Sequence, residues 1–224
     1  MGANAETKER LLAAGSVLFA ERGFHGTTVR DIAAQAAVNL AAGNYHYGSK
    51  KALYLEVLRA QFAEVRALLA QRGATRAPRE LRRLKRPQLE ALLRARVHAM
   101  LDLVIGTPEA RHAQLLQREM TDPTEALPAI VREFILPMVG EMEQIVAQLA
   151  PGLHGAHLRR CVFSIIGQVL FYRFARPAVL RVMDAEEYPP ALAAELADHI
   201  TAFSLGGLRR VAATRRADGK RQRR

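Results

Sequence analysis

The sequence predicts an all-α protein in which a small helical domain precedes a larger one. Half of the 224 residues are hydrophobic, only 6% are aromatic, and tryptophan is absent. Alanine, leucine and arginine dominate, and these residues lose little conformational entropy in a helix. Apolar residues recur at helical spacing along most of the chain, without strand-like alternation or an internal repeat. These features favour a helical fold with an ample core.

The N-terminal segment contains two short helical patterns. The first covers Thr7–Arg22, and Gly23 follows it in the position that suits a C′ glycine. Thr27 or Thr28 can cap the second helix by accepting a backbone hydrogen bond. The segment therefore predicts two helices joined by a brief turn.

A third and a fourth helix complete this unit. Asn39 precedes a third helix of about residues 40–46, and Val38 anchors the turn before it. Ser49 caps a fourth helix that starts at Lys50. Two helices separated by a turn of three to four residues, within a three-helix bundle, have the outline of a helix-turn-helix.

The rest of the chain predicts longer helices. A loop rich in glycine, proline and arginine covers residues 72–87, where we expect mobility and at most a short helix. Apolar periodicity then predicts helices over residues 88–105, 109–120, 127–149, 157–174 and 190–208. Pro137 lacks a backbone N–H, so the third of these should bend there.

Several short motifs occur in one order and spacing within the first 55 residues. Residues 23–33 read GFHGTTVRDIA, residues 37–39 read AVN, and residues 44–53 read NYHYGSKKAL. This set resembles the DNA-binding domain of the TetR family. The resemblance implies a DNA-binding domain at 4–64, with its helix-turn-helix at about 27–46. Ala37 stands where a turn glycine is usual, and Gly43 lies within the recognition helix.

A second resemblance covers the C-terminal region. Residues 117–120 read QREM, residues 123–124 read PT, and residues 131–137 and 167–177 continue the pattern. This region resembles the CecR-like subgroup of TetR regulators. It implies a ligand-binding and dimerisation domain at 87–212, and we expect a basic, disordered tail at 213–224.

The resemblance and the geometry of the major groove together suggest a set of DNA contacts. Arginine pairs bidentately with guanine, so Arg30 is the best candidate for a base contact. Lys50 would meet a phosphate at the start of the fourth helix. The alternative for the two threonines is that they only cap a helix. The full candidate set is Thr27, Thr28, Arg30, Asn39, Leu40, Ala41, Ala42, Asn44, Tyr45, His46 and Lys50.

The resemblance also implies an effector cavity among the helices between residues 89 and 173. Methionine and phenylalanine would line it, with one arginine and one glutamine as polar contacts, so we expect a largely apolar small molecule. The alternative is that these residues are simply core. The candidates are Met100, Leu103, Arg118, Met120, Phe134, Met138, Phe163, Gln168 and Phe171.

A short recognition helix reads only a few base pairs, so specific binding calls for a dimer on a palindromic operator. The segments 157–174 and 190–208 would form a four-helix interface, or else belong to the internal core. We therefore expect a homodimeric repressor that its effector releases from double-stranded DNA. A transcriptional activator, or a DNA-binding protein without a ligand, is the alternative.

Composition and motifs exclude other classes. The net charge of +11 arises in two segments, residues 72–96 and 209–224, which solvated surface or phosphate attraction would both explain. Nucleophile-elbow, P-loop, zinc-protease and dinucleotide-binding motifs are absent from the sequence. His154 and His157 have a spacing that suits a metal, but no carboxylate joins them. We therefore expect no enzyme activity, cofactor or metal, and a cytoplasmic protein without a membrane segment.

Overall fold

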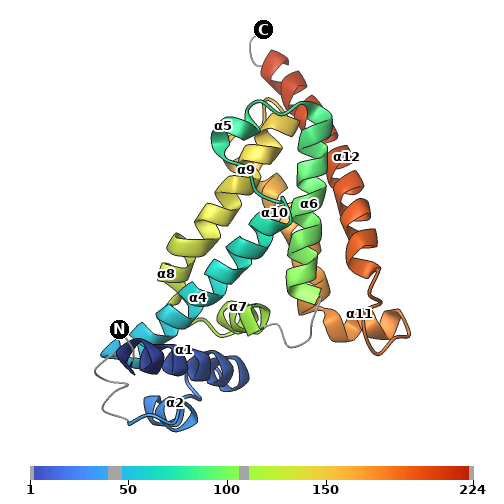
Figure 1. Ribbon diagram of the computed structural model, residues 1–224. Helices are drawn as coiled ribbons and strands as arrows, with labels where there is room; N and C mark the ends of the chain where they lie inside the picture. Colours follow the sequence, from blue (N-terminus) through green and yellow to red (C-terminus); the bar gives the residue numbers. More distant parts are fainter. Residues whose placement is uncertain (1–2, 40–46, 106–110, 222–224) are drawn as a thin grey trace. The chain divides into compact units, whose positions relative to one another are not determined.

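The computed structural model describes residues 3–39, 47–105 and 111–221 (Figure 1). All regular secondary structure in these ranges is helical, which confirms the predicted fold class. The chain divides into two compact units. The first unit comprises residues 1–66 and 109–135, and the second comprises residues 67–108 and 136–224.

The first unit contains both N-terminal helices and a later part of the chain. Its helices are α1 (Ala3–Arg22), α2 (Val29–Gln35), most of α4 (Lys50–Gln71), α7 (Arg111–Thr121), α8 (Leu127–Ile130) and the π-helical turn η1 (Val131–Ile135). Helices α1 and α7 lie side by side in Figure 1 and are in contact. Residues 109–135, which we expected within the C-terminal domain, thus belong to the same unit as the N-terminal helices.

A single hydrophobic core explains this division. Leu11, Phe19 and Ile32 of the N-terminal helices are fully buried. Leu115 and Ile130 lie in the same cluster, with exposures of 1% and 0%. Their apolar side chains are removed from water by packing on the N-terminal helices, so the later segment folds onto them.

The two aromatic rings of Phe62 and Phe134 join α4 to η1 within this core. Their centroids lie 4.2 Å apart with nearly parallel planes, and both rings are buried. Arg59 of α4 reinforces the contact from the surface, because its guanidinium donates two hydrogen bonds to the Glu133 carboxylate, at 2.9 and 3.2 Å. Helix α4 is therefore attached to η1 by both apolar and ionic contacts.

The second unit is a bundle of longer helices. It contains α5 (Pro78–Leu81), α6 (Arg86–Ile105), α9 (Leu136–Leu149), α10 (Gly155–Phe174), α11 (Arg176–Val182) and α12 (Leu192–Arg221). Helix α6 packs against α9, α10 and α12. Its Arg94 pairs with Asp198 of α12 through a hydrogen bond of 3.0 Å between Nη2 and Oδ2.

Three features differ from the predicted helices. The helix predicted over residues 127–149 is divided by the π-helical turn η1, which ends shortly before Pro137. Helix α11 was not predicted. Helix α12 continues to Arg221 through most of the segment 213–224 for which we expected disorder. Alanine and arginine, which are good helix formers, supply much of this extension.

The structure also answers whether any part of the chain could span a bilayer. Within the residues that the structure describes, none of the helices combines the length and the apolar character that a membrane crossing requires.

The core of the first unit can be tested at Phe134. Phe134→Ala should lower the free energy of unfolding by about 3–5 kcal/mol, because it removes a stacked, buried ring and leaves a cavity. Urea unfolding followed by circular dichroism measures this change. The control is Val182→Ala, at a residue that is 88% exposed. Equal effects of the two substitutions would contradict the assignment of Phe134 to the core.

Candidate nucleic-acid interface

The turn between α1 and α2 is fixed at both ends. Gly23 has φ of +74°, and its N–H donates to the Phe19 carbonyl at 3.0 Å, so it is the C′ residue that the sequence predicted. A left-handed conformation of this kind favours glycine because it has no Cβ. The chain can therefore leave α1 sharply and enter α2.

Thr27 and Thr28 have different roles although they are adjacent. Thr27 is fully buried, and its hydroxyl donates to the carbonyls of Leu18 at 3.1 Å and Gly23 at 2.9 Å. Its side chain therefore has a structural role in place of the DNA contact that we expected. A hydroxyl at this position closes the turn because it links the Leu18 carbonyl of α1 to the Gly23 carbonyl of the turn.

Thr28 caps α2, as one of the two predicted alternatives. Its Oγ1 accepts from the Asp31 N–H at 3.1 Å, and its own N–H donates to the Asp31 carboxylate at 3.0 Å. The two residues form a reciprocal capping box. The hydrogen bond from the Thr28 hydroxyl, at 2.6 Å, is the main cause that lowers the pKa of Asp31. Asp31 therefore stays ionised and holds the start of α2.

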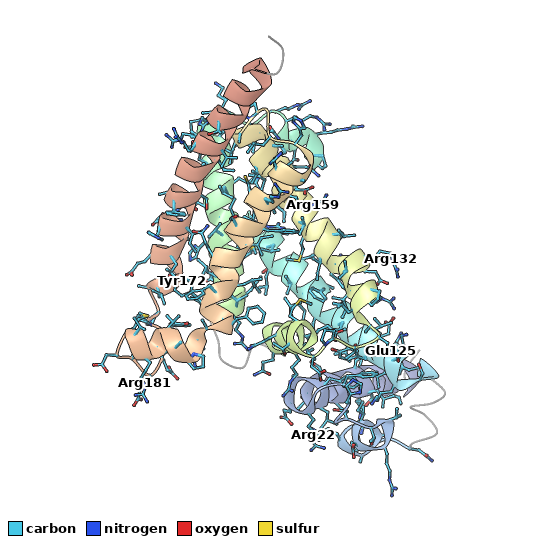
Figure 2. All side chains as sticks on the ribbon, turned by 180° about the vertical axis from the view of Figure 1, so that it is seen from behind. Arg22, Glu125, Arg132, Arg159, Tyr172 and Arg181 are labelled. Carbon is cyan, nitrogen blue, oxygen red and sulfur yellow. The ribbon has the colours of Figure 1, made fainter. Side chains whose placement is uncertain are left out.

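The capped helix presents two of the predicted contact residues to solvent. Thr28 and Arg30 are exposed at the N-terminal end of α2, and Asn39 is exposed after it. Arg22, at the end of α1, is also exposed and is labelled in Figure 2. These residues leave a polar, positively charged surface available at this end of the first unit.

The turn after α2 contains a strained residue. Ala37, which stands where a glycine is usual, has φ of +52°. The Val38 N–H donates to the Ala33 carbonyl at 3.0 Å, and the Arg10 guanidinium donates to the Ala37 carbonyl at 2.9 Å. These bonds hold a left-handed alanine in place. No motif in the sequence indicated this role for Arg10.

Lys50 ties the start of α4 to the turn between α1 and α2. Its ammonium donates to the carbonyls of Phe24 at 2.9 Å and Thr27 at 3.1 Å, and lies 4.3 Å from the centre of the Phe24 ring. Ser49 caps α4 as predicted, since its Oγ accepts from the Ala52 N–H at 3.1 Å. Two of the three ammonium donors of Lys50 thus serve the fold, a use that we did not expect.

Six of the candidate DNA contacts, Leu40, Ala41, Ala42, Asn44, Tyr45 and His46, lie outside the described residues. Tyr47, directly after them, packs against the core of the first unit, and its hydroxyl donates to the Lys8 carbonyl at 3.2 Å. Burial raises the pKa of Tyr47 to about 12. The segment 40–46 is therefore followed by an anchored aromatic residue.

The nine effector candidates are divided between the two units. Three lie in the first unit, where they serve the fold more than a cavity. The Arg118 guanidinium donates to the Ala20 carbonyl at 2.8 Å and the Glu21 carbonyl at 2.6 Å. Phe134 is stacked on Phe62, while Met120 is 39% exposed. Arg118 therefore caps the C-terminal end of α1, where a cation is stabilised by the helix dipole.

The other six candidates lie in the second unit. Met100 and Leu103 are buried on α6, and Met138 is half-buried on α9. Gln168 donates from Nε2 to the Ser204 hydroxyl at 3.3 Å. Phe163 and Phe171 are 54% and 55% exposed. We therefore withdraw these two aromatic residues from the effector set.

The sequence comparisons identify both parts of the chain. Residues 11–57 match the family of bacterial regulatory proteins, tetR family. Residues 89–208 match the C-terminal domain of the HTH-type transcriptional dual regulator CecR. The HTH-type transcriptional dual regulator CecR of Shigella flexneri is 30% identical over 189 residues, which cover 78% of this chain and 79% of that protein.

The chain belongs to the TetR family of bacterial regulatory proteins. It is a DNA-binding transcriptional regulator, and its C-terminal region is of the CecR type, as the sequence predicted.

Solved structures of transcriptional regulators have the same fold. HlyIIR, a hemolysin II transcriptional regulator, has a TM-score of 0.59 at 20% identity, over 89% of this chain and 99% of that one. A transcriptional regulator from Rhodococcus sp. Rha1 has a TM-score of 0.61 at 22% identity, over 89% and 96%. AibR, solved with isovaleryl coenzyme A and operator DNA, has a TM-score of 0.58 at 17% identity, over 88% and 97%.

The left-handed conformation of Ala37 in the turn after α2 can be tested by substitution. Ala37→Gly should raise the free energy of unfolding by about 1 kcal/mol, because glycine adopts the left-handed conformation without a Cβ clash. Ala63→Gly, at an exposed position within α4, should lower it by about 0.5–1 kcal/mol. Thermal unfolding of the three proteins measures both changes. A loss of stability in Ala37→Gly would contradict the geometry of this turn.

Proposed function

We propose that the chain is a homodimeric repressor that binds a palindromic operator and is released from it by a small, largely apolar effector. The observation that carries this proposal is the match of residues 11–57 to a DNA-binding family and of residues 89–208 to a regulatory domain. The proposed DNA-binding domain comprises residues 4–64 and the regulatory domain residues 87–212. Helices α7, α8 and the turn η1 pack with the DNA-binding helices, although they lie within the regulatory sequence.

The proposed DNA contacts come from two kinds of side chain. Arg30 is exposed and long enough to pair with a guanine at the groove edge. Lys50 retains one of its three N–H donors for a phosphate after its two bonds within the fold. Thr28 and Asn39, which are exposed, remain in the set, together with the six residues of segment 40–46.

The proposed dimer face lies on α10 and α12. Phe163, Gly167 and Phe171 are spaced four residues apart on α10 and are all exposed, so they form one stripe. Phe203 of α12 is 66% exposed, and Gly207 follows four residues later. The two helices are in contact and share the Gln168–Ser204 hydrogen bond. An exposed aromatic face of this kind supports association with a second copy.

Release by an effector needs only modest energy. A ligand can favour one arrangement of the two DNA-binding domains of the dimer. A coupling free energy of about 3 kcal/mol between the effector site and the DNA site then lowers operator affinity about 100-fold. Met100, Leu103 and Met138 remain the proposed apolar contacts in the second unit, and AibR, which has the same fold, was solved with an acyl coenzyme A. The relative from Shigella flexneri is a dual regulator, so activation as well as repression is the second candidate function.

The operator model predicts a sequence-specific site. Purified protein incubated with genomic fragments should enrich one palindromic sequence. Arg30→Ala should reduce the preference for one base pair in each half-site by about 1–3 kcal/mol, whereas Arg181→Ala, which removes the same charge from α11 (Figure 2), should leave it unchanged. Salt-sensitive binding without a preferred sequence would overturn the model.

If this face forms the dimer interface, a charge introduced there should prevent dimerisation. Phe203→Glu should convert the protein to a monomer in sedimentation velocity, because two like charges would be buried near the symmetry axis. Val182→Glu, which adds the same charge at an exposed position of α11, should remain dimeric. A Phe203→Glu variant that stays dimeric would show that the interface lies elsewhere.

A further inference from the structure

A cleft of about 150 Å³ lies within the second unit. Its walls come from α5 and the segment before it, from α6 and from α9, and Figure 1 shows α5 beside one end of α6 and α9. The wall is partly apolar, with Leu81, Leu92 and Ile145. It is partly polar, with Thr75 and Gln144. Neither Met100, Leu103 nor Met138 lines it, so it is separate from the proposed effector contacts.

The cleft contains a buried arginine. Arg96 of α6 lines it and is only 1% exposed. Its Nη1 lies 3.3 Å from the Ala74 carbonyl, to which it donates, and 2.8 Å from the Glu141 carboxylate. Its Nε–H has no hydrogen-bond partner among the residues that the structure describes. A buried guanidinium needs both a counter-charge and acceptors, and here the set of acceptors is incomplete.

The counter-ion of Arg96 is much more exposed than Arg96 itself. The Glu141 side chain is 47% exposed, whereas the Arg96 side chain is 2% exposed. Glu141 can therefore turn into water and remain solvated, but Arg96 cannot leave the interior. Another anion that enters the cleft could take the place of Glu141, because the displaced Glu141 carboxylate regains water and so offsets part of the desolvation of the incoming anion. The arrangement is that of a fixed cation with an exchangeable counter-ion.

We propose that this cleft binds a small monocarboxylate. The carboxylate replaces that of Glu141 on Arg96, in a fork geometry that arginine matches with two donors. The hydrocarbon part of the ligand lies against Leu81, Leu92 and Ile145. A cavity of about 150 Å³ holds a molecule of about the size of benzene, so butyrate and benzoate are suitable probes. Arg76, which also lines the cleft, adds a second positive charge.

A structural ion pair is the rival explanation. In that case Arg96 and Glu141 would only join α6 to α9, and the Ala74 bond would only hold the preceding loop. Removal of Glu141 would then destabilise the protein, and an added carboxylate would not restore the loss. If instead the cleft binds carboxylates, removal of Glu141 eliminates the competing anion and increases the response to the ligand.

The test measures thermal unfolding and calorimetric binding of the full chain with sodium butyrate and sodium benzoate, at constant ionic strength. Butyramide, which is neutral and nearly isosteric with butyrate, controls for the hydrocarbon part. Glu141→Gln should bind butyrate about tenfold more tightly than the wild type, the effect of about one charge-assisted hydrogen bond. Glu143→Gln is the matched control, since Glu143 lies on the same helix and pairs with Arg159 at 2.8 Å (Figure 2).

Two substitutions of the arginine complete the test. Arg96→Met should abolish the response to butyrate. Arg96→Lys keeps the positive charge but not the fork of two donors, so it should weaken butyrate binding about tenfold. This second variant keeps the test decisive if Arg96→Met does not fold. Equal stabilisation by butyramide, an unchanged response in Arg96→Lys, or no binding to either wild type or Glu141→Gln at 50 mM butyrate would each overturn the proposal. The assay contains no DNA, so failure of the operator model would leave this result unaffected.

Discussion

The buried carboxylate of Glu119 is the constraint on which the first unit depends. It is 1% exposed, and it accepts hydrogen bonds from the Tyr54 hydroxyl at 3.0 Å and from the Thr124 N–H at 2.9 Å. Burial, followed by the charge of Glu119, raises the pKa of Tyr54, which therefore remains a donor. A buried charge is tolerated only where such partners surround it, so α4 and α7 must meet at one position.

The residue before Glu119 in α7, Arg118, extends this attachment to α1. Arg118 donates to the carbonyls of Ala20 and Glu21, which the end of α1 leaves without helical partners. Two consecutive side chains of α7 thus hold two different helices of the DNA-binding unit. Helix α7 lies within the stretch that matches the CecR C-terminal domain, so this part of the sequence is bonded directly to α1 and α4.

The second unit uses its charges differently. Arg94 pairs with Asp198, and Arg159 pairs with the half-buried Glu143. Both arginines reach solvent, so these pairs between neighbouring helices contribute little to stability. Arg96 is instead enclosed, with a partner that faces solvent. The arginines of residues 72–96 therefore differ in their surroundings, because most of them are exposed whereas Arg96 is buried. Burial, not sequence position, separates a solvated arginine from one that lines a cleft.

The helical class, the family and most local signals follow from the sequence, including the caps at Thr28 and Ser49 and the C′ residue Gly23. These depend on backbone chemistry within a few residues. Long-range packing sets four other features. Thr27 faces inward, Lys50 bonds within the fold, Phe163 and Phe171 are exposed, and residues 109–135 pack with the N-terminal helices. Such outcomes depend on contacts between segments far apart in the chain, such as the 65 residues that separate Tyr54 from Glu119, which periodicity and capping rules do not encode.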